Sequence, residues 1–145
     1  MAGKIDVKKE ILNALVVAGT GVLLLALAFA LYFGLFAAFE SFANRDGSYR
    51  FVGPLRVGYG LVLCGLCAIL YRTRAPEPLK AASLAAALGT LWISLGVQFH
   101  ERPRVFLVLA FASGLGAVAL LARSKRRWYH FLAPALAAAA AFAYL

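Results

Sequence analysis

The sequence has few charged residues. Only 14% of its 145 residues are Asp, Glu, Lys or Arg, while 63% are hydrophobic and the mean hydropathy is +0.83. Soluble domains contain about 25% charged and about 45–50% apolar residues, so the composition excludes an ordinary soluble domain. Disorder is excluded as well, because disordered chains are poor in aromatic residues and this chain has eleven Phe and six Tyr. The composition predicts an integral membrane protein.

Acidic residues are especially scarce, and none falls inside a long apolar stretch. The six acids are Asp6, Glu10, Glu40, Asp46, Glu77 and Glu101. An acid within the membrane is the usual mark of a proton or sodium relay, so their positions argue against an ion-coupled transporter. A passive pore lined by backbone, hydroxyl and aromatic groups stays compatible with this pattern.

Long polar segments are also lacking. The longest stretch between the apolar segments is Glu40 to Arg50, which has eleven residues and is too short for a soluble catalytic or binding domain. We therefore expect any function to be carried by membrane helices, by their short connections or by a partner.

Five apolar stretches divide the chain, and they predict an all-α, polytopic membrane protein with a single transmembrane domain over 1–145. The expected spans are 11–39, 51–71, 79–100, 104–122 and 128–145. A helix needs about 20 mostly apolar residues to cross a bilayer. The second span carries one charge, Arg56, near its start, where a long side chain can reach the headgroups. The last is rich in Ala and contains Pro134, so an interfacial or re-entrant segment is the alternative there.

The basic residues predict the orientation of these spans. Ten fall on the side of the N-terminus and five on the other side, and cytoplasmic loops are the ones enriched in Lys and Arg. The first set is Lys4, Lys8, Lys9, Arg72, Arg74, Lys80, Arg123, Lys125, Arg126 and Arg127, and the second is Arg45, Arg50, Arg56, Arg102 and Arg104. We expect the N-terminus inside and the C-terminus outside, in the plasma membrane.

The net charge of +9 thus comes mainly from basic residues that indicate the orientation of the spans. Nucleic acid is not an expected partner, because the basic residues are spread over several short loops and form no single face. The expected partners are the lipid bilayer and either further copies of the chain or another membrane protein.

Two clusters are candidates for catalysis. Cys64 and Cys67 are three residues apart and would share one helix face, as a redox or soft-metal pair requires. They are the only two cysteines and have no further ligand at their depth, so packing is the main interpretation and no metal or other cofactor is predicted. His100 and Glu101 could do acid and base chemistry, and Arg102 and Arg104 beside them could hold a phosphate or carboxylate.

Small and hydroxyl-bearing residues support two other interpretations. Small residues recur at a spacing of four, which lets membrane helices approach closely. These stripes are Gly60–Cys64–Ala68, Ala85–Gly89, Ala110–Gly114, Ala112–Gly116 and Ala133–Ala137–Ala141. Ser94, Gln98 and Arg56 could instead bind a solute or line a narrow polar path.

The sequence therefore favours an accessory or structural component of a membrane assembly, acting through helix packing. A homo-oligomeric channel or small-solute transporter is the first alternative. A membrane enzyme that acts on a lipid or quinone is the second.

Overall fold

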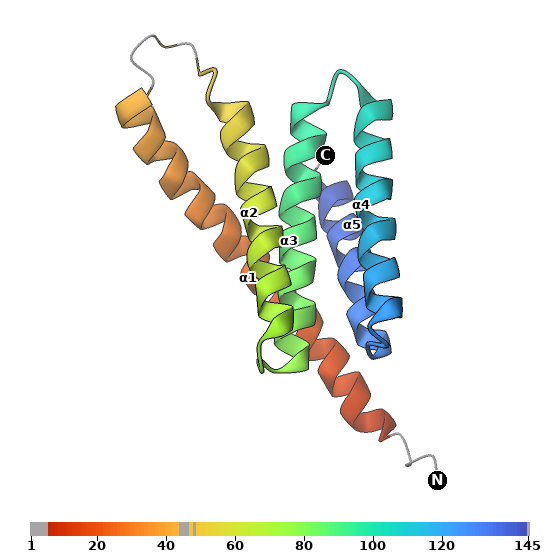
Figure 1. Ribbon diagram of the computed structural model, residues 1–145. Coiled ribbons are helices and arrows are strands. Elements are labelled where there is room, and N and C mark those ends of the chain that lie inside the picture. The colour runs from red at the N-terminus through yellow and green to blue at the C-terminus, as the bar shows by residue number, and fades with distance from the viewer. Residues whose placement is uncertain (1–5, 44–46, 48, 145) are drawn as a thin grey trace.

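The computed structural model describes residues 6–43, 47 and 49–144. Over these residues the chain is 87% helical and contains no strand. The helices are α1 (Val7–Ala43), α2 (Val52–Arg72), α3 (Glu77–Gln98), α4 (Pro103–Arg123) and α5 (Leu132–Tyr144), with the short 3-10 helix η1 (Trp128–Phe131) before α5 (Figure 1). The predicted all-α architecture is confirmed.

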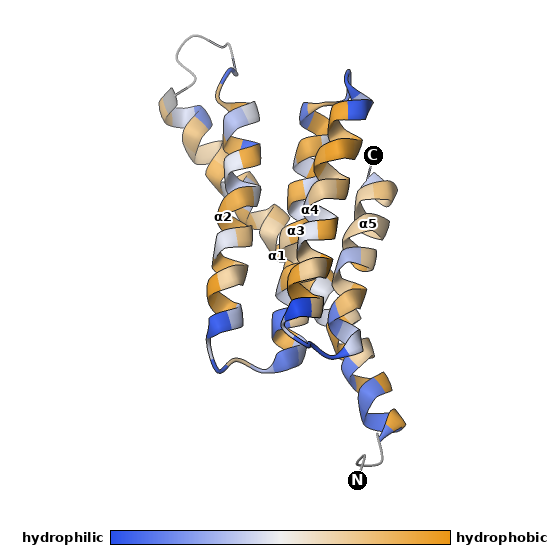
Figure 2. Cartoon of the chain, turned by 45° about the vertical axis from the view of Figure 1, so that its right-hand side comes forward, coloured by the Kyte–Doolittle hydropathy of each residue, from blue (hydrophilic) through white to orange (hydrophobic). Residues whose placement is uncertain are grey.

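Four of these helices, α1 to α4, are long and apolar enough to cross a membrane. Hydrophilic residues gather at the two ends of the bundle and apolar residues lie between them (Figure 2). The helix bounds lie within a few residues of the predicted spans, except that α1 extends four residues further at each end.

The fifth predicted span has a different form from the one expected. Its first residues make the 3-10 turn η1, and α5 itself has only 13 residues, a length of about 20 Å against a hydrocarbon core of about 30 Å. Pro134 lies in the first turn of α5, where its missing N–H is harmless, and not in a helix interior. A fifth complete crossing stays a prediction.

Helix α1 is the longest element. Its 37 residues correspond to about 56 Å, far more than the thickness of the hydrocarbon core. The helix runs obliquely to the others, and its first turns extend beyond their ends (Figure 1). A tilt and a projection beyond the bundle together accommodate its length.

Helix α3 is the centre of the molecule. In its most apolar 18-residue window 78% of the residues are buried, compared with 17%, 11% and 6% in α1, α2 and α4. It makes the main contacts of α1, α2 and α5, whereas α1 and α2 barely contact each other. The other helices therefore surround α3, which is the least hydrophobic of the four candidate spans.

Several of the predicted small-residue stripes make these contacts. Ala133, Ala137 and Ala141 are all buried and turn α5 toward α3. A Cβ added to Gly60 of α2 would lie 3.1 Å from the Cα of Leu91, so the backbones of α2 and α3 approach closely at this glycine. Close approach is what small residues permit at helix contacts in membranes.

Other stripes do not pack inside the chain. Ala68, Ala112 and Gly116 are exposed, and nothing lies within 4 Å of a Cβ added to Gly116. Their close approach to another helix stays a prediction, since these positions make no such contact within the described chain.

Short connections join the helices, two of them through proline. Pro78 and Pro103 lie in the first turns of α3 and α4, as the sequence predicts. The turn predicted around Asn44, Asp46 and Ser48 lies outside the described residues. Gly47 within it has a φ of +63°, a conformation that glycine adopts without strain.

Candidate functional site

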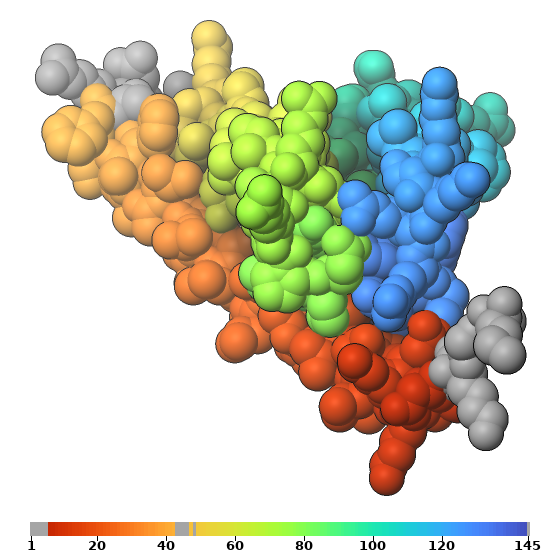
Figure 3. All heavy atoms as spheres, turned by 60° about the horizontal axis from the view of Figure 1, so that its bottom comes forward, coloured from red at the N-terminus to blue at the C-terminus, as the bar shows by residue number. Residues whose placement is uncertain are grey.

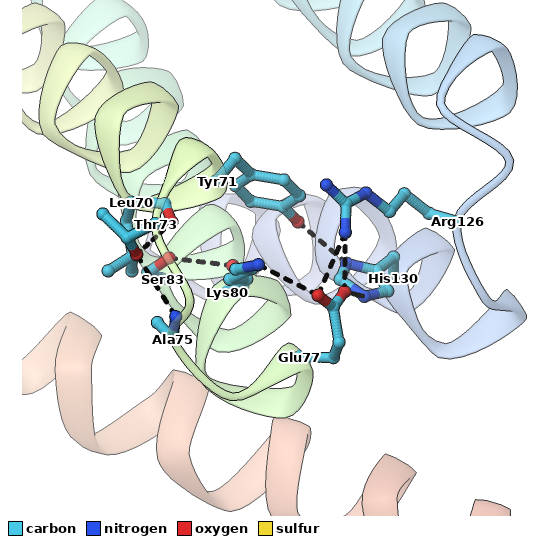
Figure 4. A network of polar contacts seen from close by, with 9 residues as sticks. All are labelled: Leu70, Tyr71, Thr73, Ala75, Glu77, Lys80, Ser83, Arg126 and His130. Atoms are coloured by element: carbon cyan, nitrogen blue, oxygen red, sulfur yellow. Dashed lines mark hydrogen bonds and ion pairs between the residues drawn. The ribbon is translucent and has the colours of Figure 1, made fainter.

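The densest polar cluster lies where α2 ends, α3 begins and α4 leads into η1. Tyr71, Lys80, Arg126 and His130 gather around the carboxylate of Glu77 (Figure 4). Figure 3 views this end of the molecule, with the α2–α3 connection beside the α4–η1 connection and the first half of α1 running alongside. We call these five residues the Glu77 cluster.

Glu77 is held by three basic side chains. Lys80 Nζ donates to Glu77 Oε1 at 2.9 Å, one turn further along α3. Arg126 Nη1 donates to both carboxylate oxygens, at 3.0 and 2.8 Å. His130 Nε2 lies 3.1 Å from Glu77 Oε2. The carboxylate thus ties the start of α3 to the segment between α4 and α5.

His130 links the cluster to α2. Its Nδ1 lies 2.9 Å from the Tyr71 hydroxyl. A neutral imidazole that accepts from Tyr71 at Nδ1 carries its proton on Nε2, which faces Glu77. The guanidinium of Arg126 also lies over the Tyr71 ring, 5.3 Å from its centroid.

The cluster is deeply buried on the His130 side. His130 has no exposed surface, and the adjacent Tyr129 stacks on it with ring centroids 5.0 Å apart. Burial lowers the pKa of His130 below its ordinary value, because the interior disfavours the charged imidazolium; the Glu77 carboxylate opposes this effect and Arg126 adds to it. His130 is therefore neutral near pH 7.

The contacts of the Glu77 cluster hold neighbouring helices together. One carboxylate pairs with two cations and lies beside one imidazole, so a buried lysine, 5% exposed, keeps a partner. A second contact nearby acts in the same way, since the Trp128 indole N–H donates to Glu10 of α1. Together these contacts join α1, α2, α3 and the α4–η1 connection at one end of the bundle.

Sequence reasoning missed this cluster. Lys80 and Arg126 enter the sequence analysis only as topology charges, and His130 falls within the last predicted span, 128–145. The available signal is the predicted topology, which places Tyr71, Glu77, Arg126 and His130 on one side of the membrane. Glu77 is also the one acid between α2 and α3, beside three basic residues.

The structure gives the two cysteines a packing environment. Cys67 is buried, and its Sγ lies 3.5 Å from Ser83 Oγ on α3, while Cys64 is half-buried. Both are free thiols. Among the described residues, no group of three or more His, Cys, Asp or Glu side chains could hold a metal ion.

The His100 group is open to solvent. His100 Nε2 and Glu101 Oε1 are 3.8 Å apart, and their side chains are 73% and 84% exposed. Arg102 and Arg104 are exposed beside them. The structure brings these four residues to the α3–α4 connection, at the opposite end of the bundle from the Glu77 cluster (Figure 1).

The remaining predicted residues lie between α2 and α3. Arg56 and Ser94 both line one cavity of about 100 Å³. Gln98 is next to Gly53 of α2, where an added Cβ would meet its Oε1 at 2.6 Å. Ser94 is buried and donates to the Thr90 carbonyl at 2.6 Å.

A larger apolar groove of about 940 Å³ separates α4 from α3 and α5. It bears no charged residue. Trp92 of α3, Ala110, Ala112 and Gly114 of α4, and Ala138 of α5 are among the residues that line it. A hydrogen bond of 2.8 Å from Trp92 Nε1 to Ser113 Oγ crosses between α3 and α4 beside the groove.

No protein-family model, no curated protein and no solved structure matches this chain.

Proposed function

We propose that the protein is an accessory component of a membrane assembly, and that a transmembrane helix of another subunit occupies the groove between α4 and α5. The observation that carries this proposal is the groove itself, which is large, apolar and left open by the chain's own helices. In a bilayer an exposed apolar surface alone is covered by lipid, but a groove lined by small residues also lets a partner helix pack closely.

The walls of the groove suit a helix. Ala110, Ala112 and Gly114 on one wall and Ala138 on the other are small, so a neighbouring backbone can come close. Bulky side chains rim the groove, with Leu107, Phe111 and Phe142 each at least 60% exposed. A partner helix would cover these side chains as it enters.

Weak attachment of α4 supports the same proposal. Only 6% of its most apolar window is buried, and its contacts with α5 are few. A helix at the edge of a bundle, with one face toward an open groove, has little packing of its own to keep it in place. A partner in the groove would supply that packing.

Native mass spectrometry of the detergent-extracted protein from its own membrane tests this proposal. We expect a defined complex with another membrane protein. Ala112→Phe fills the groove from an exposed position and should lower the fraction of complex about tenfold, as overpacking by about 1.4 kcal/mol would. Ala119→Phe is the matched control, because Ala119 is an exposed α4 residue that does not line the groove.

Two outcomes would contradict the proposal. A closed homo-oligomer with no other subunit would favour the channel or transporter alternative, and flux measurements in liposomes would follow. A monomer that carries only lipid would mean that acyl chains fill the groove.

The enzyme alternative predicts activity that is lost in Cys64→Ser or His100→Ala protein that still folds.

A further inference from the structure

A second cavity, of about 100 Å³, lies among α1, α2, α3 and α5 and has a polar lining. Its polar residues are Tyr32, Arg56, Tyr59, Thr90, Ser94 and Tyr144. Arg56 is four residues into α2, about 6 Å from the start of that helix, so the cavity is near the end of the bundle where α1 joins α2. Neither the Glu77 cluster nor the groove shares a residue with this cavity.

Two hydroxyl groups in this cavity have no partner. The Tyr32 side chain is 8% exposed and the Thr90 side chain 2% exposed, and neither hydroxyl makes a hydrogen bond within the structure. Their neighbours are satisfied, since Tyr59 donates to the Ala28 carbonyl at 2.8 Å and Ser94 to the Thr90 carbonyl. A buried hydroxyl without a partner is unfavourable, and buried polar groups in folded proteins nearly always have one.

Arg56 adds a positive charge to the same lining. It takes part in no ion pair with any acid in the described part of the chain. Its guanidinium is a cation with five N–H donors. Near a helix end such a side chain can reach the headgroups, but Arg56 lines a cavity between helices, where an unpaired charge typically marks a ligand or ion site.

We propose that this cavity binds a small monovalent anion such as chloride or nitrate. Arg56 supplies one positive charge, and Tyr32 and Thr90 line the cavity with hydroxyls that have no partner. Both hydroxyl oxygens are covered in this structure, so each side chain has to turn toward the anion to donate to it. None of the described residues that line the cavity is acidic, so it suits an anion and not a metal cation. Because one arginine neutralises a single charge, a divalent anion would leave an uncompensated charge among the helices.

Anion selectivity follows from the other lining residues. Phe29, Phe33 and Ile93 complete the cavity, so an entering ion must lose most of its water. This requirement favours weakly hydrated monovalent ions over sulfate. Gluconate is a bulky and strongly hydrated organic anion, which makes sodium gluconate the reference salt.

Chloride binding can be measured directly by ³⁵Cl NMR line broadening on the full-length protein in neutral detergent. We expect protein-dependent broadening that nitrate displaces and gluconate and sulfate do not. Arg56→Gln should weaken binding at least about tenfold, and Tyr32→Phe and Thr90→Val each about threefold to tenfold. Arg56→Lys should keep part of the affinity, because it retains the charge without the planar fork of donors.

The matched control is Arg50→Gln, which removes an exposed arginine just before α2. It should bind chloride like the wild type. Circular dichroism and size-exclusion chromatography show whether each variant is folded, and the near-isosteric Tyr32→Phe and Thr90→Val keep the test valid if Arg56→Gln does not fold. Wild-type protein without displaceable broadening would overturn the proposal, as would equal losses in Arg50→Gln and Arg56→Gln. Unchanged binding in Tyr32→Phe and Thr90→Val would also overturn it.

Discussion

Glu77 is the residue on which the polar contacts at one end of the bundle depend. It is the common partner of Lys80, Arg126 and His130. Glu77→Gln keeps the shape but leaves Lys80 buried without a counter-charge. Breaking a fully buried pair costs about 3–5 kcal/mol. The Glu77 side chain is 39% exposed, so we expect a smaller loss of about 1–3 kcal/mol in the free energy of unfolding.

Detergent-mediated unfolding followed by circular dichroism measures this loss. Glu101→Gln is the control, because its side chain is 84% exposed and its contact with His100 is long, so we expect a change within about 0.5 kcal/mol. Equal stability of the Glu77→Gln and Glu101→Gln variants would mean that the Glu77 cluster does not hold the helices together.

His130 should make the protein less stable in mild acid. Its folded pKa is lowered, so below the unfolded pKa of about 6.5 the unfolded state binds the extra proton more readily than the folded state. The stabilisation is present above that value and is lost as the pH falls through it toward the folded pKa. One proton gives a slope of at most about 1.4 kcal/mol per pH unit. Tyr71, Glu77, Lys80, Arg126 and Tyr129 surround the imidazole.

Thermal unfolding in neutral detergent at several pH values tests this prediction. His130→Gln should remove most of the slope between about pH 7 and pH 5, whatever its effect on the absolute stability. His100→Gln should leave the slope unchanged, because the His100 side chain is 73% exposed. A slope that persists in His130→Gln would assign the titration to another group.

Individual polar contacts were the least predictable part of the structure. The sequence predicts which residues lie near each membrane surface. Whether Arg126 and His130 reach Glu77 depends on how α4 and η1 pack against α3. That packing depends on the geometry of small residues, which hydropathy does not report. Among the polar residues of the small cavity, Arg56 and Ser94 stand out in the sequence because they interrupt apolar helices. Thr90 gives the same signal as Ser94, whereas Tyr32 gives none.

At the scale of whole helices, the backbone contact between α2 and α3 sets the spacing of the bundle. Gly60→Leu should cost about 1–3 kcal/mol, because its side chain would run into the backbone of Leu91. Gly65→Leu is the matched control on the same helix, since nothing lies within 4 Å of an added Cβ there. Unfolding curves in mixed detergent measure both variants, and equal stability would contradict the close contact.

The number and approximate bounds of the long helices followed from hydropathy, while their arrangement did not. Hydropathy measures how well a helix partitions into lipid, so it identifies α1 to α4 as candidate spans. Hydropathy cannot identify α3 as the central helix. The buried residues of α3 include small ones such as Ala81, Ala85 and Gly96, which allow close packing but do not make the helix strongly hydrophobic. The short α5 was misjudged in length because η1 has the same apolar composition as a helix.

In the whole molecule, the other helices cover α3, the least hydrophobic of the candidate spans. One side of α3 is covered by α5, with Leu88, Trp92 and Ile93 packed against Ala137 and Ala141. Since α5 follows α3 in the chain, a ribosome completes α3 well before α5 exists. During synthesis this face of α3 is therefore uncovered until α5 has been made.

Because α5 is made after α3, we expect the stability of a newly made chain to depend on α5. A chain stopped after Arg127 lacks Tyr129, His130 and all of α5, so it exposes the buried face of α3 and leaves Glu77 without one of its partners. We expect membrane quality-control proteases to remove this truncated chain several times faster than the full chain, since ΔΔG of about 1–2 kcal/mol already changes abundance several-fold. A pulse-chase experiment measures both half-lives, and equal half-lives would show that α3 persists in the membrane unaided.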